Sequence, residues 1–231
     1  MRLSKLLIGI LLFIGSATYA QHSPQDTLTA YYYRYPQQAI KEAEALYRQA
    51  IKNNDTPLLI KSLILKTTFT LAIDHEDYPA ILSEVEKYLS QETDSAGIAV
   101  INSYCAQLYA EYYNNNSYLI NQHTPVTDYI PEDIASWSSN IFVEKIKKCV
   151  AASLLPARKL QETPLSAYKA ILTSLTPADS LRPTLYDFLC YRAINILLQT
   201  NTPDFAETSS DSPLLFAPAD EFIATPIPAE L

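Results

Sequence analysis

Glycine is the scarcest informative residue in this 231-residue chain, occurring only three times. Two of the three lie in the apolar N-terminal segment, so Gly97 is the one glycine after residue 20. Glycine supplies the positive φ angles that tight hairpins and phosphate-binding loops require. Its scarcity argues against a glycine-rich phosphate loop of the usual kind. It also predicts a helical chain whose connections are made by Pro, Asn, Asp and Ser.

Residues that build reactive centres are also few, with three cysteines and three histidines. Cys105, Cys149 and Cys190 each lie in an apolar helical pattern, which favours buried free thiols; one disulfide with one thiol left over is the alternative. No second Cys or His stands at zinc-ligand spacing, and no Gly-x-Ser-x-Gly motif occurs. The run Asp74-His75-Glu76-Asp77 is either a weak cation site or, as we favour, a solvated turn. We therefore expect no metal, no cofactor and no enzymatic activity.

Basic residues are also fewer than acidic ones. Seventeen Lys and Arg stand against 25 Asp and Glu, which gives a formal net charge of −8. Clustered Lys and Arg are what attract nucleic acids and anionic membrane surfaces. The chain is therefore not expected to bind nucleic acid, and its charge is typical of a solvated exported protein.

Long apolar runs are missing after the N-terminus. Arg2 and Lys5 flank the start of an apolar stretch over residues 6–14, and Thr18-Tyr19-Ala20 offers small residues for cleavage before Gln21. The stretch is shorter than the roughly 20 residues that span a bilayer. This pattern predicts a signal peptide over 1–20, with an uncleaved anchor as the alternative. We expect an exported protein, periplasmic or extracellular, with no membrane span once the leader is removed.

A helical period of apolar residues recurs between residues 36 and 200. It predicts a helix over 36–53, then an apolar helix that Thr56 caps with Pro57 at its first position. A third helix is expected near Pro79, and a fourth is opened by Asp94 and Ser95. The expected inward residues are Ala39, Ala43, Leu46, Tyr47 and Ala50 in the first, Ile81, Leu82, Val85, Tyr88 and Leu89 in the third, and Ile98, Ile101, Cys105, Leu108 and Tyr112 in the fourth.

The pattern continues after a polar stretch over 114–131, which we expect to be a loop. A fifth helix is predicted from about Pro131 through Trp137 to Leu155, and a shorter one from Pro164. A last helix is expected from Pro183. Its inward stripe is predicted to contain Leu185, Phe188, Leu189, Ala193, Ile196 and Leu197.

The first two helices and the next two form similar units about 40 residues apart, near the tetratricopeptide length of ~34 and the HEAT length of ~40–47. The predicted fold is all-α, with antiparallel helical hairpins stacked in a tetratricopeptide-like array and a short extended C-terminal tail. The predicted segments are the signal peptide 1–20, an N-terminal extension 21–35 and a helical-repeat-like domain 36–200. Prolines punctuate 201–231, which is predicted to be a linker or the start of a β-domain.

Tyrosine is abundant, with 17 copies. Tyr31, Tyr32, Tyr33 and Tyr35 form the densest group and are a candidate interface, because tyrosine is enriched at protein interfaces. For most tyrosines, packing between helices is the favoured explanation, with binding of sugars or peptides as the alternative. A second group comprises Tyr109, Tyr112, Tyr113 and Tyr118.

Three acid-hydroxyl pairs have two possible explanations. Asp26-Thr27-Leu28, Asp94-Ser95-Ala96 and Asp179-Ser180-Leu181 are similar to an O-glycosylation acceptor pattern of some exported bacterial proteins. Helix N-capping by Asp, Ser or Thr is the explanation that we favour.

Four stretches together suggest a family. They are PQQAIKEAEALYRQA at 36–50, DIASW at 133–137, PTLYDFLCYRA at 183–193 and LFAPADEF at 215–222. In this order they resemble the N-terminal helical region of large bacterial alpha-2-macroglobulin-like proteins. The resemblance implies an exported protein that takes part in trapping proteases near the cell envelope. In that family a protease cuts a bait segment, the body closes around it, and many members carry a Cys-x-x-Gln thioester.

This chain departs from the complete family pattern. None of its three cysteines has glutamine at the third following position, and no bait segment or β-sandwich domain is recognised. No family functional residue is carried over. We expect a non-catalytic scaffold that partners downstream macroglobulin domains or envelope proteins, and that meets proteases only through the complete inhibitor. The alternative is a stand-alone periplasmic helical-repeat module that binds peptides, glycans or a partner protein. An unrecognised hydrolase is a third possibility.

Overall fold

The computed structural model describes residues 34–74, 77–125, 129–169, 171 and 182–200. Within these ranges the chain is helical and contains no β-strand, which confirms the all-α prediction for this part. The predicted leader and the C-terminal tail lie outside the described residues. The elements are α3 (Pro36–Asn53), α4 (Thr56–Ile73), α5 (Tyr78–Gln91), α6 (Ser95–Ile120), η2 (Ile134–Ser136), α7 (Ser139–Ser153), α8 (Ala157–Glu162), η3 (Leu165–Tyr168) and α9 (Leu185–Gln199).

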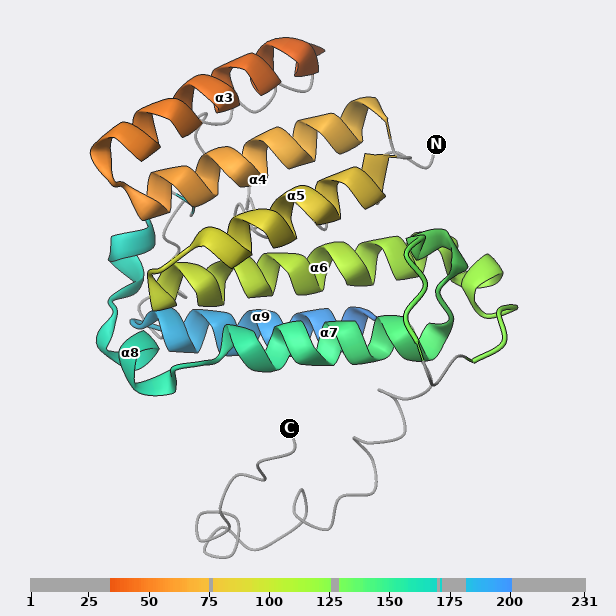
Figure 1. Ribbon diagram of the computed structural model, residues 1–231. Coiled ribbons are helices and arrows are strands. Elements are labelled where there is room, and N and C mark those ends of the chain that lie inside the picture. Colours follow the sequence, from red (N-terminus) through yellow and green to blue (C-terminus); the bar gives the residue numbers. More distant parts are fainter. Residues whose placement is uncertain (1–33, 75–76, 126–128, 170, 172–181, 201–231) are drawn as a thin grey trace, which may run out of the picture.

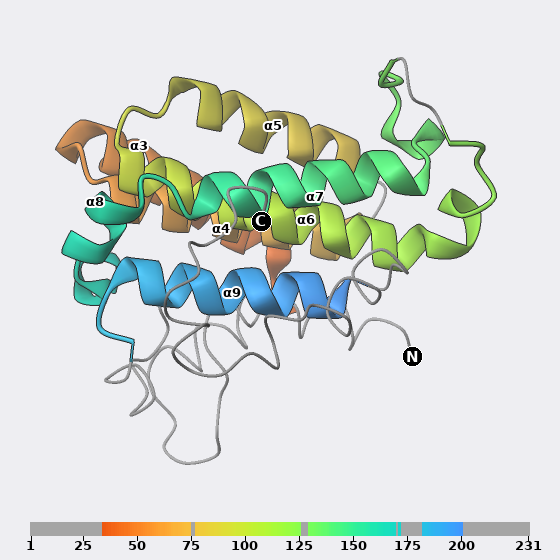
Figure 2. The same ribbon diagram turned by 90° about the horizontal axis from the view of Figure 1, so that it is seen from below.

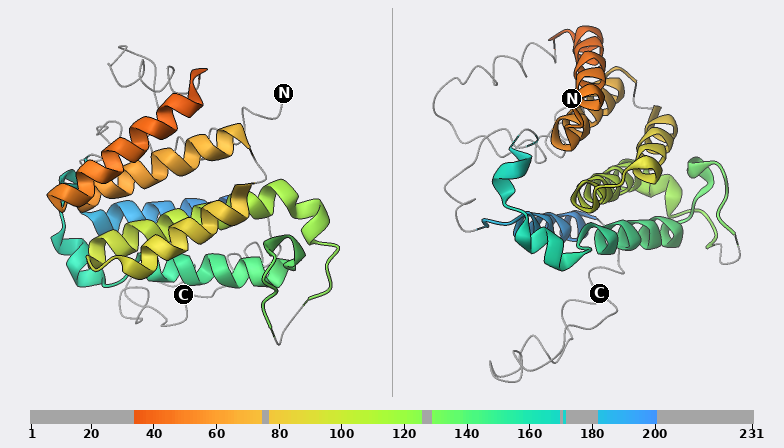
Figure 3. Two further views of the ribbon diagram at one scale, coloured as in Figure 1. Left: turned by 45° about the horizontal axis from the view of Figure 1, so that its top comes forward. Right: turned by 60° about the vertical axis from the view of Figure 1, so that its left-hand side comes forward.

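Helices α3, α4, α5 and α6 follow one another across the molecule, and α7 and α9 lie together along the far side of α6 (Figures 1 and 2). Helix α6 is central, because it packs against α4, α5, α7, α8 and α9. Helix α3 packs mainly on α4, so it forms one end of the stack. The two views of Figure 3 show α3 at the opposite end from α7.

The central helix α6 is buried on nearly all sides, as an apolar helix must be when neighbours surround it. Its large buried side chains include Tyr104, Tyr109 and Tyr113, which fill the core together with Phe142 of α7. Gly97 lies in its first turn, where an added Cβ would come within 2.8 Å of the Thr56 methyl group. The one glycine of the described residues therefore serves the close approach of α6 to the start of α4.

Helices α3 and α4 form a tight hairpin. Asn54 turns the chain with a left-handed φ of 52°, which asparagine tolerates better than most residues. The Asp55 side chain then accepts a hydrogen bond from the Leu58 amide and so caps α4. The prediction that Thr56 is the cap was therefore wrong by one residue, because the carboxylate of Asp55 reaches the free amide first.

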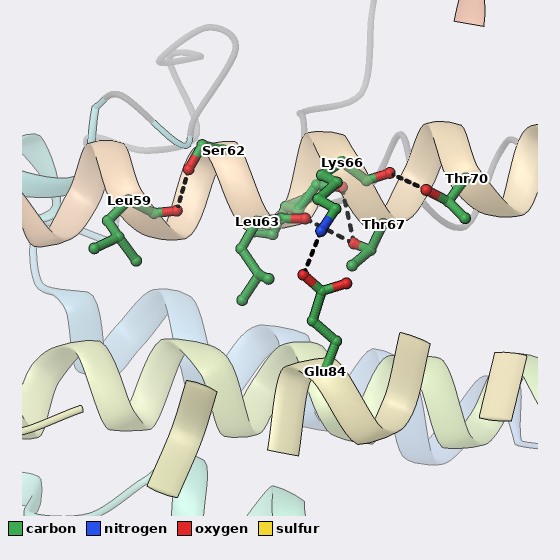
Figure 4. A network of polar contacts seen from close by, with 8 residues as sticks. Leu59, Ser62, Leu63, Lys66, Thr67, Thr70 and Glu84 are labelled. Atoms are coloured by element: carbon green, nitrogen blue, oxygen red, sulfur yellow. Dashed lines mark hydrogen bonds and ion pairs between the residues drawn. The ribbon is translucent and has the colours of Figure 1, made fainter. Parts of the chain in front are cut away.

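Several hydroxyl groups within the apolar helix α4 donate to carbonyl groups of the same helix. Ser62 donates to the Leu59 carbonyl and Thr70 to the Lys66 carbonyl, as Figure 4 shows. Such bonds to the preceding turn let hydroxyls lie in an apolar environment. Lys66 Nζ crosses to Glu84 of α5 at 2.6 Å and links the two helices.

The pairing of helices is uneven along the chain. The most extensive packing is between α3 and α4 and between α6 and α7. Helices α5 and α6, which the sequence pattern grouped as one unit, contact each other less. The main partner of α6 is therefore the helix that comes after it, whereas the third and fourth helices were predicted to form one unit.

The polar stretch 114–131 was predicted to be a loop, but α6 continues through its first seven residues to Ile120. Asn116 donates its side-chain amide to the Tyr112 carbonyl one turn earlier. The next helix starts later than predicted, because α7 begins at Ser139 and Trp137 lies before it. The Trp137 indole donates to the Pro131 carbonyl across the 3-10 turn η2 and so fixes this connection.

The last part of the described chain also differs in detail. The short helix α8 was not predicted, and the helix expected from Pro164 is a single 3-10 turn, η3. Helix α9 begins at Leu185, two residues after the expected start. There Thr184 and Asp187 form a reciprocal capping box. Phe188, expected on the inward stripe, is only partly buried at its edge.

Candidate functional site

Helix α9 places an arginine in the core. Leu185, Leu189 and Ile196 form its buried side together with Arg192, which is only 6% exposed. Arg192 Nε donates to Ser103 Oγ at 3.1 Å.

A second bond completes this attachment, because Arg192 Nη2 donates to Gln107 Oε1 at 2.6 Å. Both partners belong to α6. Hydrogen bonds from a charged donor are stronger than neutral ones, so Arg192 fixes α9 firmly on α6.

The hydrogen bonds continue from Arg192 to a carboxylate. Gln107 Nε2 donates to Glu111 Oε1 at 2.7 Å, and the Tyr78 hydroxyl of α5 donates to Glu111 Oε2 at 3.3 Å. The chain of bonds therefore runs from α9 through α6 to α5. We call Tyr78, Ser103, Gln107, Glu111 and Arg192 the Arg192 network.

The local environment shifts the pKa values of this network. Burial raises the pKa of Glu111 to about 7, against the opposing effects of hydrogen bonds from Gln107 and Tyr78 and of the Arg192 charge. Burial lowers the pKa of Arg192 to about 9, while the Glu111 charge opposes that shift. Burial is also the main cause that raises the pKa of Tyr78, which therefore stays a neutral donor. At neutral pH Arg192 is charged, so the network joins three helices through a buried cation.

This network was not predicted, although the sequence carries a signal for it. Ser103, Gln107 and Glu111 are spaced by four residues, which places them on one side of α6. Arg192 is likewise a charged residue inside an otherwise apolar stripe of α9. The polar row on α6 and the single charge in the apolar stripe of α9 could together have predicted this network.

The opposite side of α9 carries exposed apolar side chains. Tyr191, Ile194 and Leu198 are 48%, 55% and 75% exposed, and their spacing places them on one side of the helix. We call these three residues the α9 outer face. The Arg182 guanidinium lies 3.8 Å from the centre of the Tyr191 ring. Because Arg192 fixes the rotation of α9, these apolar groups are held toward solvent.

The second tyrosine group mainly serves packing. Tyr109 and Tyr113 are buried, and Tyr112 stacks on Phe142 at a ring distance of 5.6 Å. The Tyr109 hydroxyl donates to Glu86, so its polar tip is satisfied. The packing interpretation therefore holds for these three tyrosines.

Tyr118 is the exception in this group. It is 81% exposed near the end of α6.

The predicted tyrosine interface is mostly untested by the structure. Tyr31, Tyr32 and Tyr33 lie outside the described residues. Tyr35 is 48% exposed just before α3, and the Arg34 guanidinium lies 6.0 Å from its ring centre. This interface therefore stays a prediction.

The three cysteines are free thiols in the structure. Cys105 is buried as predicted, while Cys149 and Cys190 are only partly buried. Burial is the main cause that raises the pKa of each thiol, which disfavours the reactive thiolate.

No group of three or more His, Cys, Asp or Glu side chains in the described ranges could hold a metal ion. The acidic run 74–77 falls only partly within those ranges, since residues 75 and 76 lie outside them. Asp94, from one of the acid-hydroxyl pairs, accepts a hydrogen bond from the Gly97 amide and caps α6, as the capping explanation predicts. The other two pairs lie outside the described residues.

Long apolar runs were expected to be missing after the N-terminus, but helix α4 is long and apolar enough to cross a membrane by length and composition alone. Its most apolar window has a mean hydropathy of 1.3 and is 44% buried inside the protein. The core helix of a soluble protein has the same properties, so this feature gives little support to a membrane span.

Helix α9 is the candidate functional element, because one side anchors it through the Arg192 network and the other side presents apolar groups. Comparisons of this chain with protein families, with curated proteins and with solved structures find no match.

Proposed function

We propose that this chain is the non-catalytic helical scaffold of an alpha-2-macroglobulin-like protease inhibitor of the cell envelope. The α9 end of the stack adjoins the remainder of that inhibitor. In this role the scaffold is exported, positions the macroglobulin domains, and meets proteases only through the complete assembly. The helical hairpins would form an irregular tetratricopeptide-like array.

One observation carries the proposal: the two ends of the helical stack are chemically different. The outward residues of α3 are almost all polar, whereas the α9 outer face presents Tyr191, Ile194 and Leu198. Terminal units of helical stacks need a polar outer surface for solubility. A stack that is polar at one end and apolar at the other is therefore suited to continue at its apolar end.

The four sequence stretches that resemble the macroglobulin family give this scaffold a specific context. Two of them, 36–50 and 183–193, fall on α3 and α9, which are the first and last helices of the described chain. The stretch 133–137 covers the 3-10 turn η2 and Trp137. Three of the four stretches therefore coincide with defined elements of the structure.

Recovery of the chain from its native envelope tests this function. An epitope-tagged chain, expressed from its own locus, is expected in a protein or complex that contains macroglobulin β-domains and a Cys-x-x-Gln thioester. Added protease should become trapped in that material. Recovery as a free monomer, with no macroglobulin domain and no protease trapped, would overturn the proposal.

A stand-alone periplasmic binding module is the second candidate. It is favoured by exposed aromatic side chains near the connection between α6 and α7, where Tyr118 and Tyr129 are 81% and 68% exposed. Aromatic side chains with polar tips suit sugar and peptide surfaces. Binding of a defined glycan or peptide by the purified chain would support this function if the Tyr118→Ser/Tyr129→Ser variant abolished binding. Unchanged binding by that variant would count against this surface.

A further inference from the structure

We infer that residues 214–222 of this chain cover the α9 outer face. The inference deepens the proposed function and rests on it in one respect, namely that the scaffold adjoins the remainder of the inhibitor at α9. It names the segment that makes the junction and the three side chains that receive it.

The α9 outer face has the chemistry of a small docking site. Tyr191, Ile194 and Leu198 expose on the order of 300 Å² of largely apolar side-chain surface, within the range of functional patches on soluble proteins. A stable dimer buries roughly 800 Å² on each partner. The patch is therefore too small to hold a second copy by itself. A second copy would also bring two Arg182 side chains toward the same interface.

The chain leaves α9 at a fixed point. Thr200 is buried, and both its amide and its hydroxyl donate to the Ile196 carbonyl. Leu214 lies 14 residues later in the sequence, a distance that an extended chain can span over roughly 45–50 Å. Helix α9, with 15 residues, is about 22 Å long. Leu214 can therefore reach any position along α9, and the covalent link makes its association intramolecular.

The sequence of the segment complements this surface. Residues 214–216 are Leu-Leu-Phe, and Asp220-Glu221-Phe222 come shortly after. Residues 201–231 contain six Asp or Glu and no Lys, Arg or His. The apolar groups match the α9 outer face, and the acids match the Arg182 guanidinium beside Tyr191.

Hydrogen exchange of the mature full-length chain, residues 21–231, tests the inference. Amides of 214–222 should exchange at least tenfold more slowly than in an isolated peptide of the same sequence. The Ile194→Ser/Leu198→Ser variant should remove this protection. The matched control is Tyr118→Ser/Leu119→Ser, which removes two other exposed apolar groups and should leave the protection unchanged.

A photo-crosslinker distinguishes the possible occupants. With p-benzoylphenylalanine in place of Ile194, the expected product has the mass of one chain and joins position 194 to residues 214–222. A product with the mass of two chains, a crosslink to another segment, or unprotected amides in 214–222 would overturn the inference. Because this test uses the isolated chain, its failure is distinct from failure to recover macroglobulin domains in the envelope experiment.

Discussion

The two outer helices of the stack, α3 and α9, differ in the chemistry of their exposed sides. Both bury one side against a neighbour in the bundle. The exposed side of α3 is polar apart from Ala45 and Ile51. The exposed side of α9 instead carries the apolar α9 outer face. The difference indicates that, among the described helices, α9 and not α3 has an apolar surface that another segment can cover.

The two helices are also held in different ways. Helix α3 meets α4 through small side chains, since Ala39, Ala43 and Ala50 are all buried. Helix α9 is joined to α6 by the charged hydrogen bonds of Arg192. Small residues allow close approach without specific bonds, whereas buried polar groups demand one geometry. The rotation of α9, and hence the direction of its outer face, is therefore the more strongly specified of the two.

The largest expected effect comes from removing the anchor of α9. Arg192→Ala takes the cationic donor away from Ser103 and Gln107 and leaves Glu111 without the nearby positive charge. We expect a loss of about 3–5 kcal/mol in the free energy of unfolding, measured by urea denaturation. The control Arg48→Ala, on the exposed side of α3, should change it by less than about 0.5 kcal/mol. Equal effects would contradict the structural difference between the two helices.

The pH dependence of stability should report on the same anchor. The pKa of Glu111 is about 7 in the folded protein, above its ordinary value of 4.5, so the folded state binds the proton more tightly. This contribution is complete below pH 4.5 and is lost as pH rises to about 7. The slope should not exceed about 1.4 kcal/mol per pH unit, which is the limit for a single proton.

Urea denaturation across this pH range, with Glu111→Gln as the reference, measures that contribution. The difference between wild type and Glu111→Gln should change between pH 4.5 and 7. The exposed Glu144→Gln variant should keep the wild-type slope. A wild-type slope that persists in Glu111→Gln would assign the dependence to other groups.

A smaller effect is expected at the seam between α3 and α4. Ala43→Leu adds three carbons where no space exists and should cost about 1–3 kcal/mol. Ala45→Leu makes the same change on the exposed side of α3 and should be nearly neutral. Thermal unfolding of the two variants provides the comparison. Equal melting temperatures would show that α3 is not packed through Ala43.

The smallest effect is expected at Gly97. Replacing glycine by alanine favours the helix by roughly 0.5–1 kcal/mol. The new Cβ would meet the Thr56 methyl group at 2.8 Å, however, and offset this gain. We expect Gly97→Ala to change stability by less than about 1 kcal/mol, and Gly97→Ala/Thr56→Ser to be more stable than Gly97→Ala. Calorimetry that found no gain from the second substitution would show that the Thr56 methyl group does not limit this position.

The helices themselves could be predicted well from the sequence. The scarcity of glycine and the apolar period predicted all of the long helices, and α3 agreed to the residue. Errors concentrated at ends and connections. Asn116 extends α6 by bonding within the helix, and the Trp137 indole bonds across the 3-10 turn η2 where a helical period continued. Local polar bonds decided these boundaries, and apolar spacing does not report them.

The candidate site was less predictable. The inward stripe of α9 was expected from Leu185, Leu189 and Ile196, and these residues are buried. The role of Arg192 was missed, because its partners lie more than 80 residues earlier in the chain. The exposure of Tyr191, Ile194 and Leu198 could not be predicted either, because it depends on which helices cover α9.

The sequence by itself determined that the described part of this protein is helical, and it located the apolar side of most helices. Periodicity is a local property, so it is visible without knowledge of the neighbours. Only the tertiary structure decided that α6 is central, that a buried arginine locks α9, and that the two ends of the stack differ. These properties depend on contacts between residues far apart in sequence, where desolvation and exposure are set by the assembled helices.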